Sequence, residues 1–155
     1  DPFLSSFHFI LPGFNFRPTE IQGAIGCAQM DKISDFVSKR RENADYLIDG
    51  LSQFSCVRLQ KPIANGDSSW FGFGLVFSDE ALRGNFVRLA TAANVETRPI
   101  VGGDMTAQPM LREAGHGTDG YKIAQEISNC GVMLGNHQFN IDANIDLLIR
   151  IIKKL

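Results

Sequence analysis

The sequence predicts an α+β fold, a small α/β sandwich in which helices pack on a sheet of few strands. Apolar residues recur with a period of about 3.6 over residues 31–54 and 142–155, as in amphipathic helices. Between them, residues 70–77 (WFGFGLVF) form the aromatic and β-branched run of a buried strand. The chain has 155 residues, a length that fits one domain, so we expect helices and strands to share a core.

The other elements follow in order from caps, turns and apolar runs. Thr19 is a suitable N-cap or first-turn residue for the first helix, and Ser78 is a good cap for the third. Trp70 lies at the start of the buried strand, so we expect it in the core rather than stacked on a ligand. The predicted helices cover residues 19–30, 31–54, 79–94, 107–114, 121–129 and 142–155, and the predicted strands cover 56–59, 70–77, 95–101 and 132–134.

Composition excludes several classes of partner. The formal net charge is -2, so there is no basic excess to displace counterions from nucleic acid. No apolar run approaches the ~20 residues of a membrane span, and no signal peptide is visible. The three cysteines are far apart and no CxxC occurs, so we expect reduced cysteines and no metal site. These features predict a cytoplasmic protein without a nucleic-acid or membrane partner.

The most informative stretch is GFNFRPTEIQGAIG at residues 13–26, where a turn and a helix start enclose two polar side chains. An amide donor at Asn15 and a planar guanidinium at Arg17 suit phosphate oxygens. The alternatives are a turn residue at Asn15 and a surface ion pair between Arg17 and Glu20. Spacing alone does not separate these interpretations.

Residues 13–30 resemble the segment that opens the C-terminal part of the DegT/StrS family of vitamin B6-dependent enzymes. The family pattern is Gly-Tyr/Phe-Asn-x-Arg-x-Thr/Ser-Asp/Glu-x-Gln-Ala-Ala-Ile-Gly-x-x-Gln-Leu, and the chain matches nearly every fixed position, with Gly23 in place of the usual Ala. The resemblance extends over almost the whole chain. Three further blocks match the family: Lys39-Arg40-Arg41 with Ala44, residues 95–99 (VETRP), and Gln108-Pro109.

The resemblance implies the C-terminal domain of a fold-type I transferase dependent on pyridoxal phosphate, with a mainly antiparallel sheet. Residues 1–30 would then be an interface segment and helix leading from a large domain, and residues 31–155 the small domain. It also implies a homodimer or higher oligomer, because family active sites take residues from both subunits. The chain begins at Asp1 without an initiator Met, which fits a cleaved chain or a truncated reading frame.

Family members act on nucleotide-linked keto sugars with pyridoxal 5'-phosphate or pyridoxamine 5'-phosphate. Residues 100–107 look more like the loop of the 4-keto-6-deoxyhexose 3-dehydrases of deoxysugar and lipopolysaccharide biosynthesis than like the His-Tyr-Pro stretch of the aminotransferases. Asp104 stands where those dehydrases often have Asn, so a nucleotide-sugar aminotransferase stays the alternative. A third possibility, from another class, is a non-catalytic dimerisation or binding module.

The resemblance also assigns roles to individual residues. In the family, the Schiff-base lysine (or its histidine replacement) and the acid on the pyridine nitrogen precede this segment, so we expect no catalytic residue here, no tight cofactor binding and no activity of the chain alone. Asn15 and Arg17 would reach into the partner's site, toward cofactor phosphate and substrate. The candidate substrate-binding residues are Arg98, Gly103, Asp104 and His137. The alternatives are a structural ion pair for Arg98 and a simple turn at Gly102-Gly103.

Overall fold

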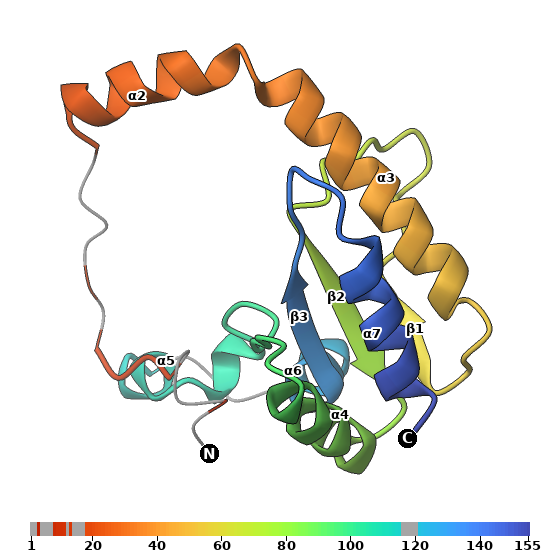
Figure 1. The fold of residues 1–155 in the computed structure, drawn as a ribbon. Helices are drawn as coiled ribbons and strands as arrows, with labels where there is room; N and C mark the ends of the chain where they lie inside the picture. The colour runs from red at the N-terminus through yellow and green to blue at the C-terminus, as the bar shows by residue number, and fades with distance from the viewer. Residues whose placement is uncertain (1–2, 4–7, 12, 14–17, 116–120) are drawn as a thin grey trace.

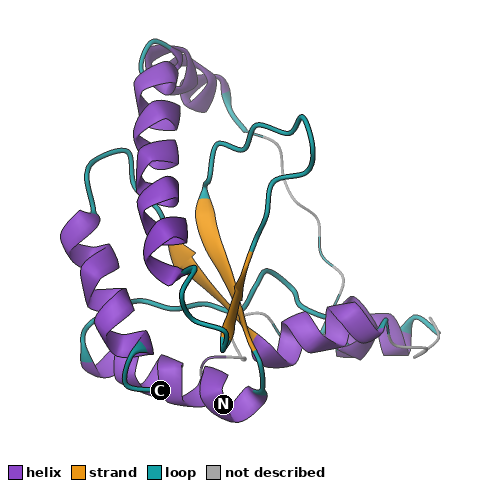
Figure 2. Cartoon of the chain, turned by 90° about the vertical axis from the view of Figure 1, so that its right-hand side faces the viewer, coloured by secondary structure: helices purple, strands orange, loops and turns teal. Residues whose placement is uncertain are grey.

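The computed structural model describes residues 3, 8–11, 13, 18–115 and 121–155. Three antiparallel strands in the order β1-β2-β3 form a sheet, and helices pack against it (Figures 1 and 2). This confirms the predicted α+β class with an antiparallel sheet. The elements are α2 (Glu20–Met30), α3 (Ile33–Leu51), β1 (Val57–Leu59), β2 (Gly72–Phe77), α4 (Glu80–Ala92), the 3-10 helix η1 (Met105–Ala107), α5 (Pro109–Glu113), α6 (Lys122–Cys130), β3 (Gly131–Gly135) and α7 (Asp142–Ile152).

The central strand β2 fixes the sheet. It pairs with β1 in the register Val57↔Phe77 and with β3 in the register Gly72↔Gly135. Gly72 is buried, and a Cβ at this position would lie 2.8 Å from the Leu134 carbonyl oxygen, so the close approach of β2 and β3 requires glycine here.

The core lies between the sheet and the helices α3, α4 and α7. Phe77 of β2 and Phe86 of α4 meet with ring centroids 4.9 Å apart. Ile145 of α7 is fully buried, because the apolar stripe of that helix faces the sheet. Trp70 is only 8% exposed, which confirms its predicted place in the core.

Helix α2 has a different environment. It projects from the end of α3 away from the sheet (Figure 1), and every one of its residues is exposed. Its predicted N-cap is confirmed: Thr19 precedes the helix, and the Thr19 N–H donates to Gln22 Oε1 at 2.6 Å. Ile21 and Ile25 are exposed, so the core does not hold α2 in place.

Two local predictions are wrong. The cap of α4 is Asp79 rather than Ser78, because the Asp79 backbone is extended and its Oδ1 accepts the Leu82 N–H at 2.8 Å. Residues 95–101 do not form a strand: Arg98 alone pairs with Met133, in an isolated bridge. Pro99 lacks the N–H that a ladder needs, and Val101 has a left-handed φ of 48°, so the chain turns away from the sheet.

Candidate functional site

A pocket of about 420 Å³ opens at the β3 edge of the sheet, between β3, α7 and the segment 94–98. Its apolar walls come from the sheet and from α7, with Phe73, Leu134 and Ile145 among them. Polar side chains line it as well, including Glu96, Arg98, Asn136, His137 and Asn144. An apolar cavity of this size with a few polar groups is typical of a small-molecule site.

Arg98 enters the pocket lining because its backbone pairs with β3. The Arg98 N–H donates to the Met133 carbonyl oxygen at 3.0 Å, and the Met133 N–H returns a bond of 2.7 Å. Its guanidinium donates from Nη2 (2.8 Å) and Nε (3.0 Å) to Glu96 Oε1. The ion pair that was the alternative interpretation of Arg98 is therefore formed in the structure, with Glu96. Both side chains are mostly exposed, and such pairs are weak, so the guanidinium can exchange this partner for a ligand.

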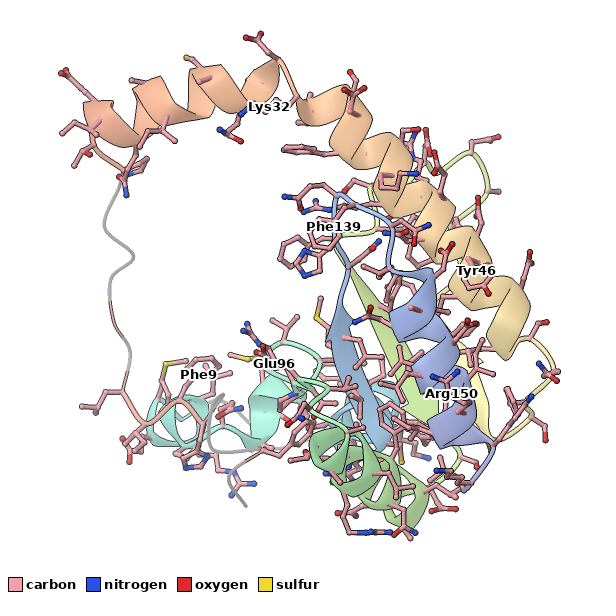
Figure 3. The ribbon with its side chains drawn as sticks, in the orientation of Figure 1. Phe9, Lys32, Tyr46, Glu96, Phe139 and Arg150 are labelled. Atoms are coloured by element: carbon pink, nitrogen blue, oxygen red, sulfur yellow. The ribbon has the colours of Figure 1, made fainter. Side chains whose placement is uncertain are left out.

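His137 lies in the loop that follows β3. Its backbone N–H donates to Asn136 Oδ1 at 2.8 Å, and its ring stacks on Phe139 at 4.6 Å between centroids. Figure 3 places Phe139 on this loop beside α3. The His137 side chain is exposed and lines the pocket. The structure thus brings His137 and Arg98, two of the predicted site residues, to one pocket.

Gly103 and Asp104 lie apart from the pocket lining. Gly103 has a φ of 61°, and a Cβ there would meet Ser128 Oγ of α6 at 2.5 Å. Asp104 is 4% exposed and its Oδ1 accepts from the Thr106 N–H at 3.0 Å and from Thr106 Oγ1 at 2.6 Å, which caps η1. These contacts give both residues structural roles, and their part in substrate binding stays a prediction.

The two arms predicted from the opening stretch, Asn15 and Arg17, lie outside the described residues. In the part of the chain that the structure covers, no cluster of three His, Cys, Asp or Glu side chains could hold a metal ion. The helices of that part are all too short or too polar to cross a membrane.

Sequence reasoning missed Asn43 and Asn136, which hold the His137 loop. Asn43 is 1% exposed on α3, next to Ala44 in the buried stripe of that helix. A polar residue inside an apolar helical stripe was a signal for such a role, because a buried amide needs hydrogen-bond partners. Asn136 directly follows β3 and carried no comparable signal.

Residues 3–153 match the model of the DegT/DnrJ/EryC1/StrS aminotransferase family. The chain belongs to this family. Within it, the chain is 36% identical over 162 residues to a GDP-4-keto-6-deoxy-D-mannose 3-dehydratase of Yersinia pseudotuberculosis, and 34% identical over 157 residues to a protein of that name from Escherichia coli O55:H7. Each match covers 99% of this chain and 40% of the relative, so the chain spans about two fifths of the length of these DegT/DnrJ/EryC1/StrS members.

Solved structures of the family agree with this assignment. The E. coli GDP-4-keto-6-deoxy-D-mannose-3-dehydratase with bound hydrated PLP superposes with a TM-score of 0.78 at 33% identity, over 98% of this chain and 40% of that one. The DegT/StrS resemblance inferred from residues 13–30 and three further blocks is therefore confirmed.

Proposed function

We propose that this chain forms the C-terminal part of a nucleotide-sugar enzyme dependent on pyridoxamine or pyridoxal phosphate. The reaction we favour is the 3-dehydration of a 4-keto-6-deoxyhexose in deoxysugar or lipopolysaccharide biosynthesis, in the cytoplasm. The observation that carries this proposal is the similarity to GDP-4-keto-6-deoxy-D-mannose 3-dehydratases along 99% of the chain. We assign residues 31–155 to the small domain and residues 1–30 to a segment at the interface of a homodimer.

The pocket supports a role in holding the sugar. Arg98 supplies N–H donors, the paired Glu96 supplies carboxylate acceptors, and His137 adds an imidazole. A keto sugar has hydroxyl and carbonyl oxygens around a ring whose C–H groups are apolar. The pocket lining likewise combines polar groups with apolar side chains such as Leu134. In this proposal these groups bind and orient the substrate.

The cofactor would be held mainly by residues other than those of the pocket. When bound, it supplies an electron sink. A lysine is absent from the described pocket lining, and Lys39 is engaged by Glu42 on the surface of α3. Without a lysine, the described pocket lining has no group that could form a Schiff base with the cofactor, so we assign none of its residues to chemistry on the cofactor ring. Asn15 and Arg17 stay the candidates for contact with the cofactor phosphate of a partner subunit.

A nucleotide-sugar aminotransferase is the second candidate, because the matching family is named for that activity. The two reactions differ in the group that meets the cofactor: a lysine forms a Schiff base, whereas a histidine leaves pyridoxamine phosphate free. A non-catalytic dimerisation module would have neither. Sequencing the coding region that precedes Asp1 decides among the three.

The direct test uses the product of the complete reading frame with pyridoxamine phosphate and a GDP-linked 4-keto-6-deoxy sugar. We expect the sugar to lose its C3 hydroxyl, and mass spectrometry of the sugar measures this loss. An amino sugar that forms only with an amino donor would support the aminotransferase instead. For this chain alone, titration with pyridoxal phosphate monitored by absorbance should reveal no stable stoichiometric complex; such a complex would overturn the division of roles proposed above.

A further inference from the structure

Three segments of the chain meet at the side chain of Asn136, which is 6% exposed. Its Nδ2 donates to the Arg40 carbonyl oxygen of α3 and to the Trp70 carbonyl oxygen before β2, each at 2.9 Å. Its Oδ1 accepts from Asn43 Nδ2 at 3.0 Å and from the His137 N–H at 2.8 Å. An amide has two donors and two acceptor sites, so every hydrogen-bonding site of Asn136 is used.

Asn43 completes the connection from the side of α3. Besides Asn136, its Nδ2 lies within hydrogen-bond distance of the His137 carbonyl oxygen (3.0 Å) and the Phe139 carbonyl oxygen (2.9 Å). Two buried amides therefore hold the backbone on both sides of the His137 ring, and Phe139 stacks against that ring. A buried polar network of this kind, in which every polar atom of the Asn136 side chain is bonded, favours one arrangement of the backbone.

The same network reaches a second exposed residue of the pocket lining, Phe71. Trp70 has a left-handed φ of 48°, which is uncommon for a large side chain and requires support from its surroundings. Its N–H donates to Ser68 Oγ at 3.0 Å and its carbonyl oxygen accepts from Asn136. In this conformation the Trp70 ring is buried, while the next side chain, Phe71, is 71% exposed and lines the pocket.

We propose that Asn136, supported by Asn43, is a positioning residue that sets His137 and Phe71 at the mouth of the pocket. It acts through backbone atoms, because its own polar atoms are all engaged and none is left for a ligand. The functional meaning of this role rests on the proposed function, in which the pocket binds the nucleotide sugar. The structural part of the proposal can be tested without any ligand.

The test replaces Asn136 by its isostere in the full chain. Asn136→Asp keeps an acceptor for the His137 N–H but loses both donors and places a negative charge beside two carbonyl oxygens. The measurement is the NMR signal of the His137 ring, which the stacked Phe139 ring shifts; Phe139→Leu gives the unshifted position. We expect Asn136→Asp to move the signal most of the way to that position, at temperatures where circular dichroism reports a folded protein.

Asn85→Asp is the matched control, since it makes the same chemical change on the exposed side of α4. It should leave the His137 signal in place. A residue with only a structural role would lower the melting temperature without moving the signal of the folded state, so an unmoved signal in Asn136→Asp overturns the proposal. If Asn136→Asp does not fold, Asn43→Ser gives the second test: a partial shift is expected, and no shift overturns the proposal.

Binding experiments then separate this role from the proposed function. GDP-mannose serves as the probe in calorimetric titrations of the complete enzyme. We expect Asn136→Asp to weaken binding at least as much as His137→Ala, because it also affects Phe71, and the double variant to bind no more weakly than Asn136→Asp alone, because Asn136 acts through His137. Absence of GDP-mannose binding to the unaltered protein would count against the proposed function and leave the NMR result standing. Additive losses would overturn the positioning role.

Discussion

The hydroxyl of Tyr46 on α3 donates a hydrogen bond of 2.9 Å to Asp146 Oδ1 on α7. The two residues stand 100 positions apart in the chain, and the bond joins the two helices at the surface. Figure 3 labels Tyr46 on α3. The hydrogen bond and the negative charge of Asp146 raise the pKa of Tyr46 above its ordinary value, since both favour the neutral phenol.

This shift predicts how the link depends on pH. An unperturbed tyrosine has a pKa of about 10, and the folded-state pKa is higher, so the contribution to stability is fully present below about pH 10 and is lost as pH rises through the folded-state value. Urea denaturation at a series of pH values from about 8 upward should show that Tyr46→Phe is less stable than the natural protein at the lowest pH, and that this difference shrinks as the pH rises above about 10. Tyr121→Phe, at an exposed position, is the control. A constant gap across this range would contradict the link.

The cap of α4 provides a second test. Asp79→Ala removes the acceptor for the Leu82 N–H and should lower the free energy of unfolding by about 1 kcal/mol. Ser78→Ala, one position earlier, should cost less because Ser78 Oγ makes only a 3.4 Å contact with the Cys56 carbonyl oxygen. Chemical denaturation of the two variants gives the comparison, and a larger loss from the Ser78 variant would restore the original prediction of the cap.

Gly103 should tolerate substitution less well than Gly115. Both have left-handed φ values, 61° and 75°, but among the described residues an added Cβ would meet a neighbour only at Gly103, where Ser128 lies. Backbone strain alone should cost Gly115→Ala about 1 kcal/mol, whereas Gly103→Ala adds the clash with α6 and should cost about 2–3 kcal/mol. Ser128→Gly in the same chain should recover part of the difference. Equal losses in thermal unfolding would show that the loop near Gly103 moves freely away from α6.

Arg98 should matter for binding and little for folding. Arg98→Gln removes an exposed pair, so the unfolding free energy should change by less than about 0.5 kcal/mol. If the guanidinium binds the sugar nucleotide, affinity for GDP-mannose in the complete enzyme should fall about tenfold to a hundredfold. Arg58→Gln removes a similarly exposed pair with Glu126 away from the pocket and is the control. An unchanged affinity in Arg98→Gln would show that Arg98 does not bind the ligand and forms only a surface ion pair.

The sequence predicted those elements whose residue patterns are local. Residues 70–77 and 142–155 showed burial and periodicity directly, and β2 and α7 lie within them. The segment 95–101 had strand composition, but one proline and the left-handed backbone of Val101 prevent more than a single bridge. Local composition could not reveal that this segment lies at the edge of the sheet, because edge position depends on the pairing of distant strands.

The site was predictable in part for the same reason. Arg98 and His137 stood in recognisable contexts, and the structure brings both to one pocket. The contact between Asn43 and Asn136 spans 93 positions, and no spacing rule connects two such residues. Glu96 was within reach of sequence reasoning, since residues two apart in an extended chain point to the same side, and its carboxylate does meet Arg98.

Helix α2 has 11 residues, includes two glycines and buries none of its side chains. Isolated helices shorter than about 12–15 residues are marginal in water, so α2 gains little stability from its contacts within the described chain. In the homodimer proposed above, folding of α2 and its docking onto the partner subunit are one event, so dilution should unwind the helix while leaving the sheet and its packed helices intact.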